Sequence, residues 1–262
     1  MSIVALAADG SSFETPGVAD FWQPLIGDGA WAVTRASIVA LLSVAIISWA
    51  LLAGTKKLAV VPSKKQAATE AIYGLVREGL GRDVIGSKDF LRFMPLIFTL
   101  FTMVLLNNLF SVIPVIYFPT MSRVAFPAVL AIVVFFVYHY IGMQKHGVIG
   151  YFKSLVPSGL PIALVPYIFV LQLITDVFTR PVTLALRLFG NMFAGHLLLV
   201  LFVSGGQYMI AHGAIGIKIA GGGSILMGFV MTLFEILVQV LQAYIFALLA
   251  AIYIAGALAD EH

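Results

Sequence analysis

Long apolar runs, each comparable in length to the thickness of a bilayer, dominate this chain. A helix rises about 1.5 Å per residue, so about 20 apolar residues cross the hydrocarbon core of a membrane. Residues 33–53, 93–113 and 124–143 fit this length. Residues 162–203 and 225–255 exceed the length of one perpendicular span and predict tilted helices. The pattern therefore predicts an all-α polytopic membrane protein of five to six helices, with a long tilted C-terminal helical hairpin.

The segments between these runs set the expected topology. Residues 1–32 contain acidic side chains but no Lys or Arg, whereas the main positive block follows the first span. Positive loops stay on the cytoplasmic side, so we expect the N-terminus outside and the C-terminus in the cytoplasm. Within the positive block, residues 66–80 have helical spacing and predict an amphipathic helix on the membrane surface. Residues 204–224 are rich in Gly and predict an outer loop.

Composition agrees with a single membrane domain over residues 1–262. The chain is 61% hydrophobic and 10% charged, against about half and about a quarter in soluble domains. It has no Cys, which excludes disulfides, thiolate metal sites and thiol catalysis. The basic segment lies beside spanning helices and requires no nucleic-acid partner. Asn107 and Asn108, in the second span, are expected to hydrogen-bond another helix rather than to line a channel.

Arg187 places a permanent charge near the middle of an apolar helix pattern. An Arg keeps its proton inside a protein, and insertion scales put its cost at a helix centre at about 2.5–3.5 kcal/mol. Such a residue either has a functional partner or extends its head group to the membrane interface. Because the apolar run continues from Leu188 to Val203, we favour a functional role for Arg187. Arg180, nearer the polar end, fits the interfacial alternative.

Helical geometry sorts the polar residues around Arg187 into two faces. At 100° per residue, Asn191 lies about 40° from Arg187, whereas His196 lies about 180° from it. Arg187 and Asn191 therefore share one face, and His196 is on the opposite face. The pKa of His is close to physiological pH, which suits a proton relay, although a His bonded to a carboxylate can also be structural.

The last predicted helix carries one polar stripe. Glu235, Gln239 and Gln242 fall within about 60° of each other on a helix. Measured from the predicted hairpin turn, His196 and Glu235 lie at roughly 10 and 15 Å, and Arg187 and Gln242 at roughly 24 and 25 Å. We therefore expect His196 opposite Glu235 and Arg187 opposite Gln242. Helix–helix hydrogen bonding is the alternative role for the two Gln side chains.

Two motifs of this region resemble the signature of subunit a of rotary F-type ATP synthases. The first is Leu186-Arg187-Leu188-Phe189-Gly190-Asn191-Met192, followed by Ala194-Gly195. The second is Glu235 followed by Gln242-Ala243-Tyr244-Ile245-Phe246. The two motifs occur in the expected order, each at its expected end, so the resemblance is specific.

The resemblance implies a proton-translocating stator with two offset half-channels. Arg187 would face the carboxylate of the c-ring and deprotonate it, so that proton flow drives rotation and ATP synthesis. His196 and Glu235 would line the outer half-channel. The candidate proton-translocation residues are Arg187, Asn191, His196, Glu235, Gln239 and Gln242.

The resemblance also implies which subunits, ion and membrane the chain works with. The expected partners are the c-ring, the peripheral-stalk b subunits and membrane lipid. Protons would be the transported ion, with no cofactor and no catalysis by the chain alone. Many bacterial members have the acid before the histidine; here His196 precedes Glu235, similar to the mitochondrial arrangement. We expect the bacterial inner membrane, with the mitochondrial inner membrane as the alternative.

An alternative function of a different class would also use Arg187. A stand-alone secondary transporter or channel could use Arg187 as an anion site. Such transporters commonly contain an internal repeat with broken helices in both halves. Here only the C-terminal half has over-long, interrupted helix patterns, which favours the stator.

Overall fold

Five long apolar helices form most of the chain. A computed structural model describes residues 24–26, 33–56, 59, 62–87, 89–113, 118–156, 161 and 164–259. Among these residues, the helices long and apolar enough to cross a membrane are α2 (Arg35–Thr55), α4 (Phe90–Leu109), α5 (Ala125–Ser154), the continuous stretch Val165–His212 and α8 (Ile215–Leu258). Helices suit this setting because they satisfy every backbone hydrogen bond within one segment. The predicted all-α polytopic fold is confirmed.

Shorter elements lie before and between these helices. Strands β1 (Pro24–Ile26) and β2 (Val33–Thr34) form a short antiparallel pair. Helix α3 (Lys64–Val76) begins at Ser63, whose Oγ accepts a hydrogen bond of 3.3 Å from the backbone N–H of Gln66. It continues as the π-helical segment η2 (Arg77–Ile85). The helix thus extends five residues beyond the range predicted for the surface helix, residues 66–80.

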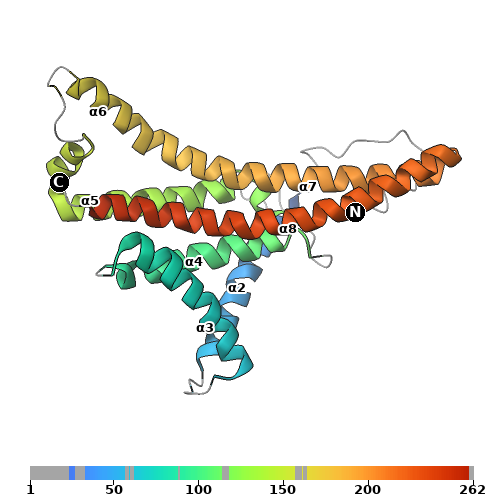
Figure 1. Ribbon diagram of the computed structural model, residues 1–262, viewed down its shortest axis with the longest axis horizontal. Helices are drawn as coiled ribbons and strands as arrows, with labels where there is room; N and C mark the ends of the chain where they lie inside the picture. Colours follow the sequence, from blue (N-terminus) through green and yellow to red (C-terminus); the bar gives the residue numbers. More distant parts are fainter. Residues whose placement is uncertain are drawn as a thin grey trace. The chain divides into compact units, whose positions relative to one another are not determined.

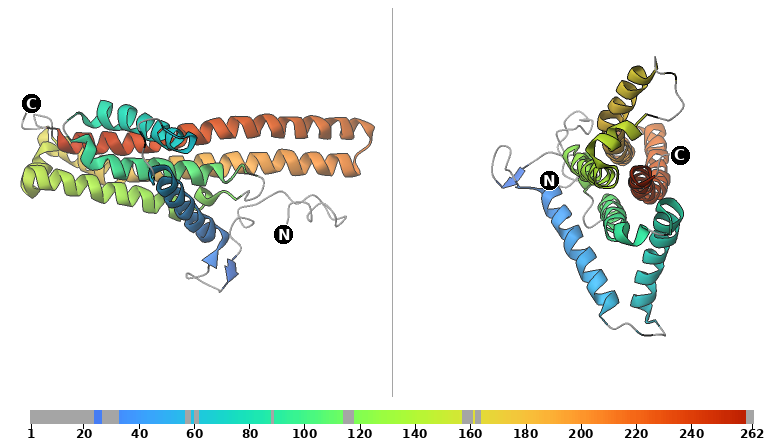
Figure 2. Two further views of the ribbon diagram at one scale, coloured as in Figure 1. Left: turned by 90° about the horizontal axis from the view of Figure 1, so that it is seen from below. Right: turned by 90° about the vertical axis from the view of Figure 1, so that its left-hand side faces the viewer.

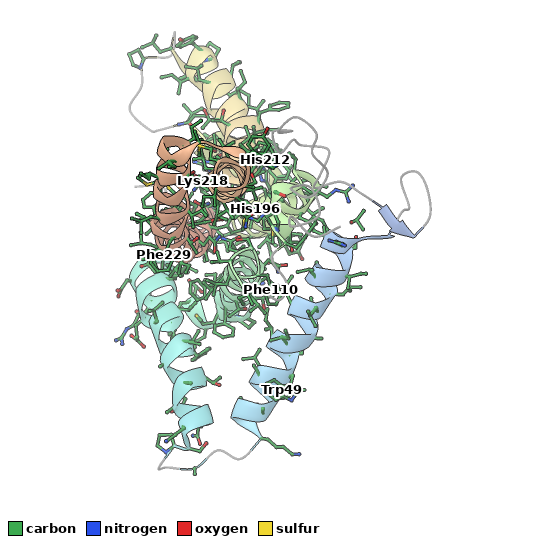
Figure 3. All side chains as sticks on the ribbon, turned by 90° about the vertical axis from the view of Figure 1, so that its right-hand side faces the viewer. Trp49, Phe110, His196, His212, Lys218 and Phe229 are labelled. Atoms are coloured by element: carbon green, nitrogen blue, oxygen red, sulfur yellow. The ribbon has the colours of Figure 1, made fainter. Side chains whose placement is uncertain are left out.

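The chain divides into two compact units. The first contains Met1–Leu41, Asn107–Arg123 and Phe189–Leu241, and the second contains Leu42–Leu106, Val124–Leu188 and Gln242–His262. Apolar side chains such as Leu41 and Trp49 of α2 are exposed, at 72% and 67%; Trp49 is labelled in Figure 3. Exposed apolar surface of this kind is expected where lipid or another subunit covers a helix.

In the first unit, the parts of α7 (Arg180–His212) and α8 that belong to it run side by side as an antiparallel pair (Figures 1 and 2). The prediction of an outer loop at residues 204–224 is wrong. Helix α7 continues to His212, and α8 begins at Ile215. The glycines of this region allow the two helices to approach each other closely. A Cβ on Gly206 would lie 2.9 Å from the carbonyl oxygen of Gly221, a separation that only glycine allows without a shift.

In the second unit, α5 runs parallel to the C-terminal part of α8. The rings of Tyr138 and Tyr253 lie 5.7 Å apart, and further along both helices Lys145 Nζ donates a hydrogen bond to the carbonyl of Leu258. Helix α5 extends well past residue 143, where its span was predicted to end. It is interrupted at Gly147, whose φ of 72° favours glycine. Beyond this break, Tyr151 packs against Gly142.

A π-helical turn precedes Pro181 in the second unit. Helix α6 (Val165–Ile174) continues through η4 (Thr175–Thr179) into α7. Proline lacks an N–H and its ring clashes with the carbonyl four residues earlier, here that of Val177 in η4. A wider π turn relieves this conflict. The helix axis changes direction along this stretch (Figure 1), as is common where a proline interrupts a helix.

Candidate functional site

The first unit contains a buried hydrogen-bonded cluster around Glu235, formed by Asn108, Ser111, Glu235 and Gln239. Gln239 Nε2 donates to Glu235 Oε1 at 3.0 Å and to Ser111 Oγ at 2.6 Å. Ser111 Oγ donates to Glu235 Oε1 at 3.5 Å. Asn108 Nδ2 donates to the backbone carbonyl of Gln239 at 3.3 Å, a bond between α4 and α8 of the expected kind. The cluster therefore joins the end of α4 to the polar stripe of α8.

The carboxyl group of Glu235 is held asymmetrically. Its side chain is only 5% exposed, and Oε1 accepts bonds from both Gln239 and Ser111. The other oxygen, Oε2, is buried without a hydrogen-bond partner among the residues that the structure describes. Burying an ionised carboxylate without full pairing is costly. This geometry suits a group that exchanges a proton at Oε2 while Oε1 remains anchored.

Helix α7 approaches this cluster at Gly195. A Cβ at Gly195 would lie 3.5 Å from Cγ, Cδ and Oε1 of Glu235, so the backbone of α7 passes close to the carboxyl group. The next residue, His196, is 3% exposed and is labelled in Figure 3. His196 thus lies in the interior at the level of the Glu235 cluster. The opposition of His196 and Glu235 themselves stays a prediction.

The two faces predicted for α7 differ in burial. Arg187 and Asn191 are both exposed, whereas His196 is buried. On the inward side beside Arg187, Leu184 is 1% and Leu188 0% exposed. Arg187 has no hydrogen bond or ion pair with any residue that the structure describes. Its guanidinium group is therefore directed away from the chain's own core, where a partner outside the chain can reach it.

The polar stripe predicted on α8 faces inward. Glu235 is 5%, Gln239 4% and Gln242 3% exposed, while Leu237 on the other side is 62% exposed. The first two belong to the Glu235 cluster. Gln242, in the second unit together with Arg187, is buried, whereas Arg187 is exposed. The expected pairing of Arg187 with Gln242 stays a prediction.

The second unit contains another polar cluster, which we call the Asp176 cluster: Tyr138, Tyr151, Asp176, Arg180 and Tyr253. Asp176, 2% exposed, forms an ion pair with Arg180 NH1, and the Tyr151 side chain lies near its carboxyl group. The hydroxyl of Tyr138 donates to the backbone carbonyl of Asp176 at 2.7 Å. The Arg180 guanidinium carbon lies 5.1 Å from the centroid of the Tyr253 ring, a cation–π geometry.

Sequence reasoning missed the Asp176 cluster. It placed Arg180 at the membrane interface, which stays a prediction, and did not foresee its ion pair with a buried carboxylate. The i, i+4 spacing of Asp176 and Arg180 could have indicated the pair. No local signal marks Tyr138 or Tyr253, which reach the cluster from α5 and α8. Within the described part of the chain, no three His, Asp or Glu side chains are close enough to hold a metal ion.

Comparison with known proteins gives a consistent result over nearly the whole chain. A family model described as ATP synthase A chain matches residues 37–255. The chain is 42% identical to the ATP synthase subunit a of Nocardioides sp. (strain ATCC BAA-499 / JS614), over 99% of this chain and 98% of that protein. It is 41% identical to the ATP synthase subunit a of Pseudarthrobacter chlorophenolicus, over 98% of this chain and 97% of that protein. It is 38% identical to the ATP synthase subunit a of Streptomyces lividans, over 97% of this chain and 91% of that protein.

Proposed function

Because the chain belongs to the family of ATP synthase A chains, we propose that it is the proton-translocating stator subunit of a rotary ATP synthase in a bacterial inner membrane. Its partners would be the c-ring, the peripheral-stalk b subunits and lipid. Membership of this family favours the stator over a stand-alone anion transporter. The similarity to bacterial proteins likewise favours the bacterial membrane over the mitochondrial one.

The observation that carries the mechanism is the exposed guanidinium of Arg187. It lies in a long apolar helix and has no ion-pair partner among the described residues. An opposite charge nearby favours the ionised form of a carboxyl group. A rotor carboxyl that reaches Arg187 therefore releases its proton and binds the arginine as a carboxylate. Because an arginine keeps its own proton, it also prevents protons from passing directly between the two half-channels.

The Glu235 cluster supplies the outer half-channel in this proposal. Glu235 can take up a proton at Oε2 while Gln239 and Ser111 hold Oε1. His196 is buried on the adjoining turn of α7 beside Gly195 and would be the second proton carrier. Gln239 orients the carboxyl group, and Asn191 and Gln242 flank the site of the arginine. Rotation would connect this half-channel to an offset one that opens on the cytoplasmic side.

The test is Arg187→Ala in the assembled complex, in sealed inverted membrane vesicles. Two rates would be followed with a pH-sensitive dye: acidification driven by ATP, and passive proton leak after the soluble sector is removed. We expect pumping to be abolished and the leak to rise, because the rotor carboxyl loses its counter-charge and the barrier between the half-channels is gone.

Arg187→Lys is the matched control, because it keeps the positive charge but loses the planar, permanently protonated group. Compared with Arg187→Ala, the Arg187→Lys complex should regain most of the barrier to proton leak but less of the pumping rate. The amount of the chain in the purified complex reports assembly. Pumping at the parental rate in a fully assembled Arg187→Ala complex would contradict the proposed mechanism.

A further inference from the structure

The first turns of α7 carry two arginines on one side. Arg180 and Arg187 are seven residues apart, which corresponds to an angular offset of about 20° and an axial separation of about 10 Å on an ideal helix. Arg180 is 36% exposed, and Arg187 is exposed as well. A rotor carboxylate that moves past α7 could therefore meet two guanidinium groups rather than one.

The Asp176 cluster neutralises one of the two arginines within the chain itself. Asp176 lies one helical turn before Arg180 and forms an ion pair with it. The Tyr138 hydroxyl holds the backbone of the aspartate by a hydrogen bond to its carbonyl, and Tyr151 lies near its carboxyl group. On its other side the guanidinium of Arg180 lies over the ring of Tyr253. The charge of Arg180 is thus balanced by a buried partner, whereas Arg187 forms no ion pair with any residue in the described part of the chain.

The balance matters because an ion pair is strong in a membrane. At an effective dielectric constant of about 20, two unit charges attract each other about four times as strongly as they do in water. An uncompensated second arginine would hold the rotor carboxylate about two helical turns away from its working position. The rotor would have to break that pair in every step, so the rate of rotation would fall.

We propose that Asp176 is a positioning residue of the stator, whose role is to neutralise Arg180 so that rotor carboxylates engage only Arg187. This inference rests on the proposed function. It assigns Asp176 an effect through Arg180 and no part in carrying protons. A second substitution that removes the cation should therefore correct the loss of the aspartate.

The first test compares Asp176→Asn with the double variant Asp176→Asn/Arg180→Gln in the assembled complex. ATP-driven acidification would be measured in inverted vesicles, at equal amounts of assembled chain. Asp176→Asn should lower pumping about tenfold, which corresponds to about 1.4 kcal/mol of added barrier. The double variant should return to within about threefold of the parental rate. A double variant as slow as Asp176→Asn would overturn the proposal, because it would show that the carboxyl group itself is needed.

A second test leaves the buried pair intact and so does not depend on the stability of the Asp176 variant. Thr183 is exposed and lies one turn before Arg187. Thr183→Lys would place a new unbalanced cation on this side of α7, and Thr183→Gln is its neutral control. We expect Thr183→Lys to pump about tenfold more slowly than Thr183→Gln. Equal pumping by the two variants would overturn the proposal.

The same vesicles separate this inference from the proposed function. If Arg187→Ala abolishes pumping while assembled Asp176→Asn pumps at the parental rate, the neutralising role of Asp176 is wrong and the stator role stands. If Arg187→Ala pumps normally, the stator mechanism itself is wrong. Slow pumping by Asp176→Asn with recovery in the double variant, together with loss in Arg187→Ala, supports both.

Discussion

At the scale of single residues, hydrogen bonds and burial hold the carboxyl group of Glu235 in place. Gln239 Nε2 lies 3.0 Å from Oε1, and the side chain is 5% exposed. A hydrogen bond to a charged group contributes about 1.5–3 kcal/mol. These bonds orient the carboxyl group without occupying Oε2, which is the arrangement that the proposed proton-carrying role requires.

Glu235→Gln should lower ATP-driven pumping at least tenfold. The amide has nearly the same shape and can still accept the bonds from Gln239 and Ser111 at its oxygen, but it cannot release a proton. Pumping would be followed by dye quenching in inverted vesicles. Ser111→Ala is the control, since it removes one donor to Oε1 and leaves the carboxyl group, and it should reduce the rate by less than about threefold. Unchanged pumping by Glu235→Gln would exclude a proton-carrying role.

At the scale of elements, the antiparallel pair of α7 and α8 in the first unit depends on glycines at its contact. Cβ atoms on Gly206 and Gly221 would lie within 3 Å of the backbone of the opposite helix. Small residues allow such close approach, which strengthens van der Waals contact and makes up for the missing hydrophobic drive between helices in lipid. By contrast, a Cβ on Gly222 or Gly223 would meet nothing within 4 Å.

Gly206→Ala should therefore destabilise the hairpin by about 1–3 kcal/mol, the usual cost of overpacking a close contact. Gly222→Ala is the matched control, because it adds the same methyl group in open space and should stabilise the helix by about 0.5–1 kcal/mol. The measurement is the temperature at which half of the chain is lost from the purified complex. Equal temperatures for the two variants would mean that the two helices do not approach closely at Gly206.

At the scale of the whole molecule, the arrangement of charges predicts an orientation. The positive block after α2 belongs to the cytoplasmic side by the positive-inside rule. Five spans then place the N-terminus outside and the C-terminus in the cytoplasm. In the proposed function, the orientation decides which side of the membrane supplies protons to the Glu235 cluster.

The chain is suited to a labelling test because it contains no cysteine. A single Cys at Ser11 should react with a membrane-impermeant maleimide in intact cells. A single Cys at Ala259 should react only in inverted vesicles. The two positions serve as controls for each other, and labelling with the opposite sidedness would reverse the predicted orientation.

Much of the fold could be predicted because its signals are local. Apolar runs of sufficient length form helices in a bilayer whatever their neighbours are. The 100° step of a helix likewise placed Glu235, Gln239 and Gln242 on one face, and all three are buried. The Gly-rich connection was the failure, because glycine is typical both of loops and of closely packed membrane helices.

The sequence by itself determined the fold class and the family, and it singled out Arg187 and Glu235 as candidates, because hydropathy, helical period and motif are properties of a short stretch of chain. Only the tertiary structure decided that Ser111, 124 residues before Glu235, would bind its carboxyl group. It also decided that Asp176 would balance Arg180 among tyrosines of α5 and α8. Such contacts depend on how the helices pack, because packing determines which side chains from distant parts of the chain face each other.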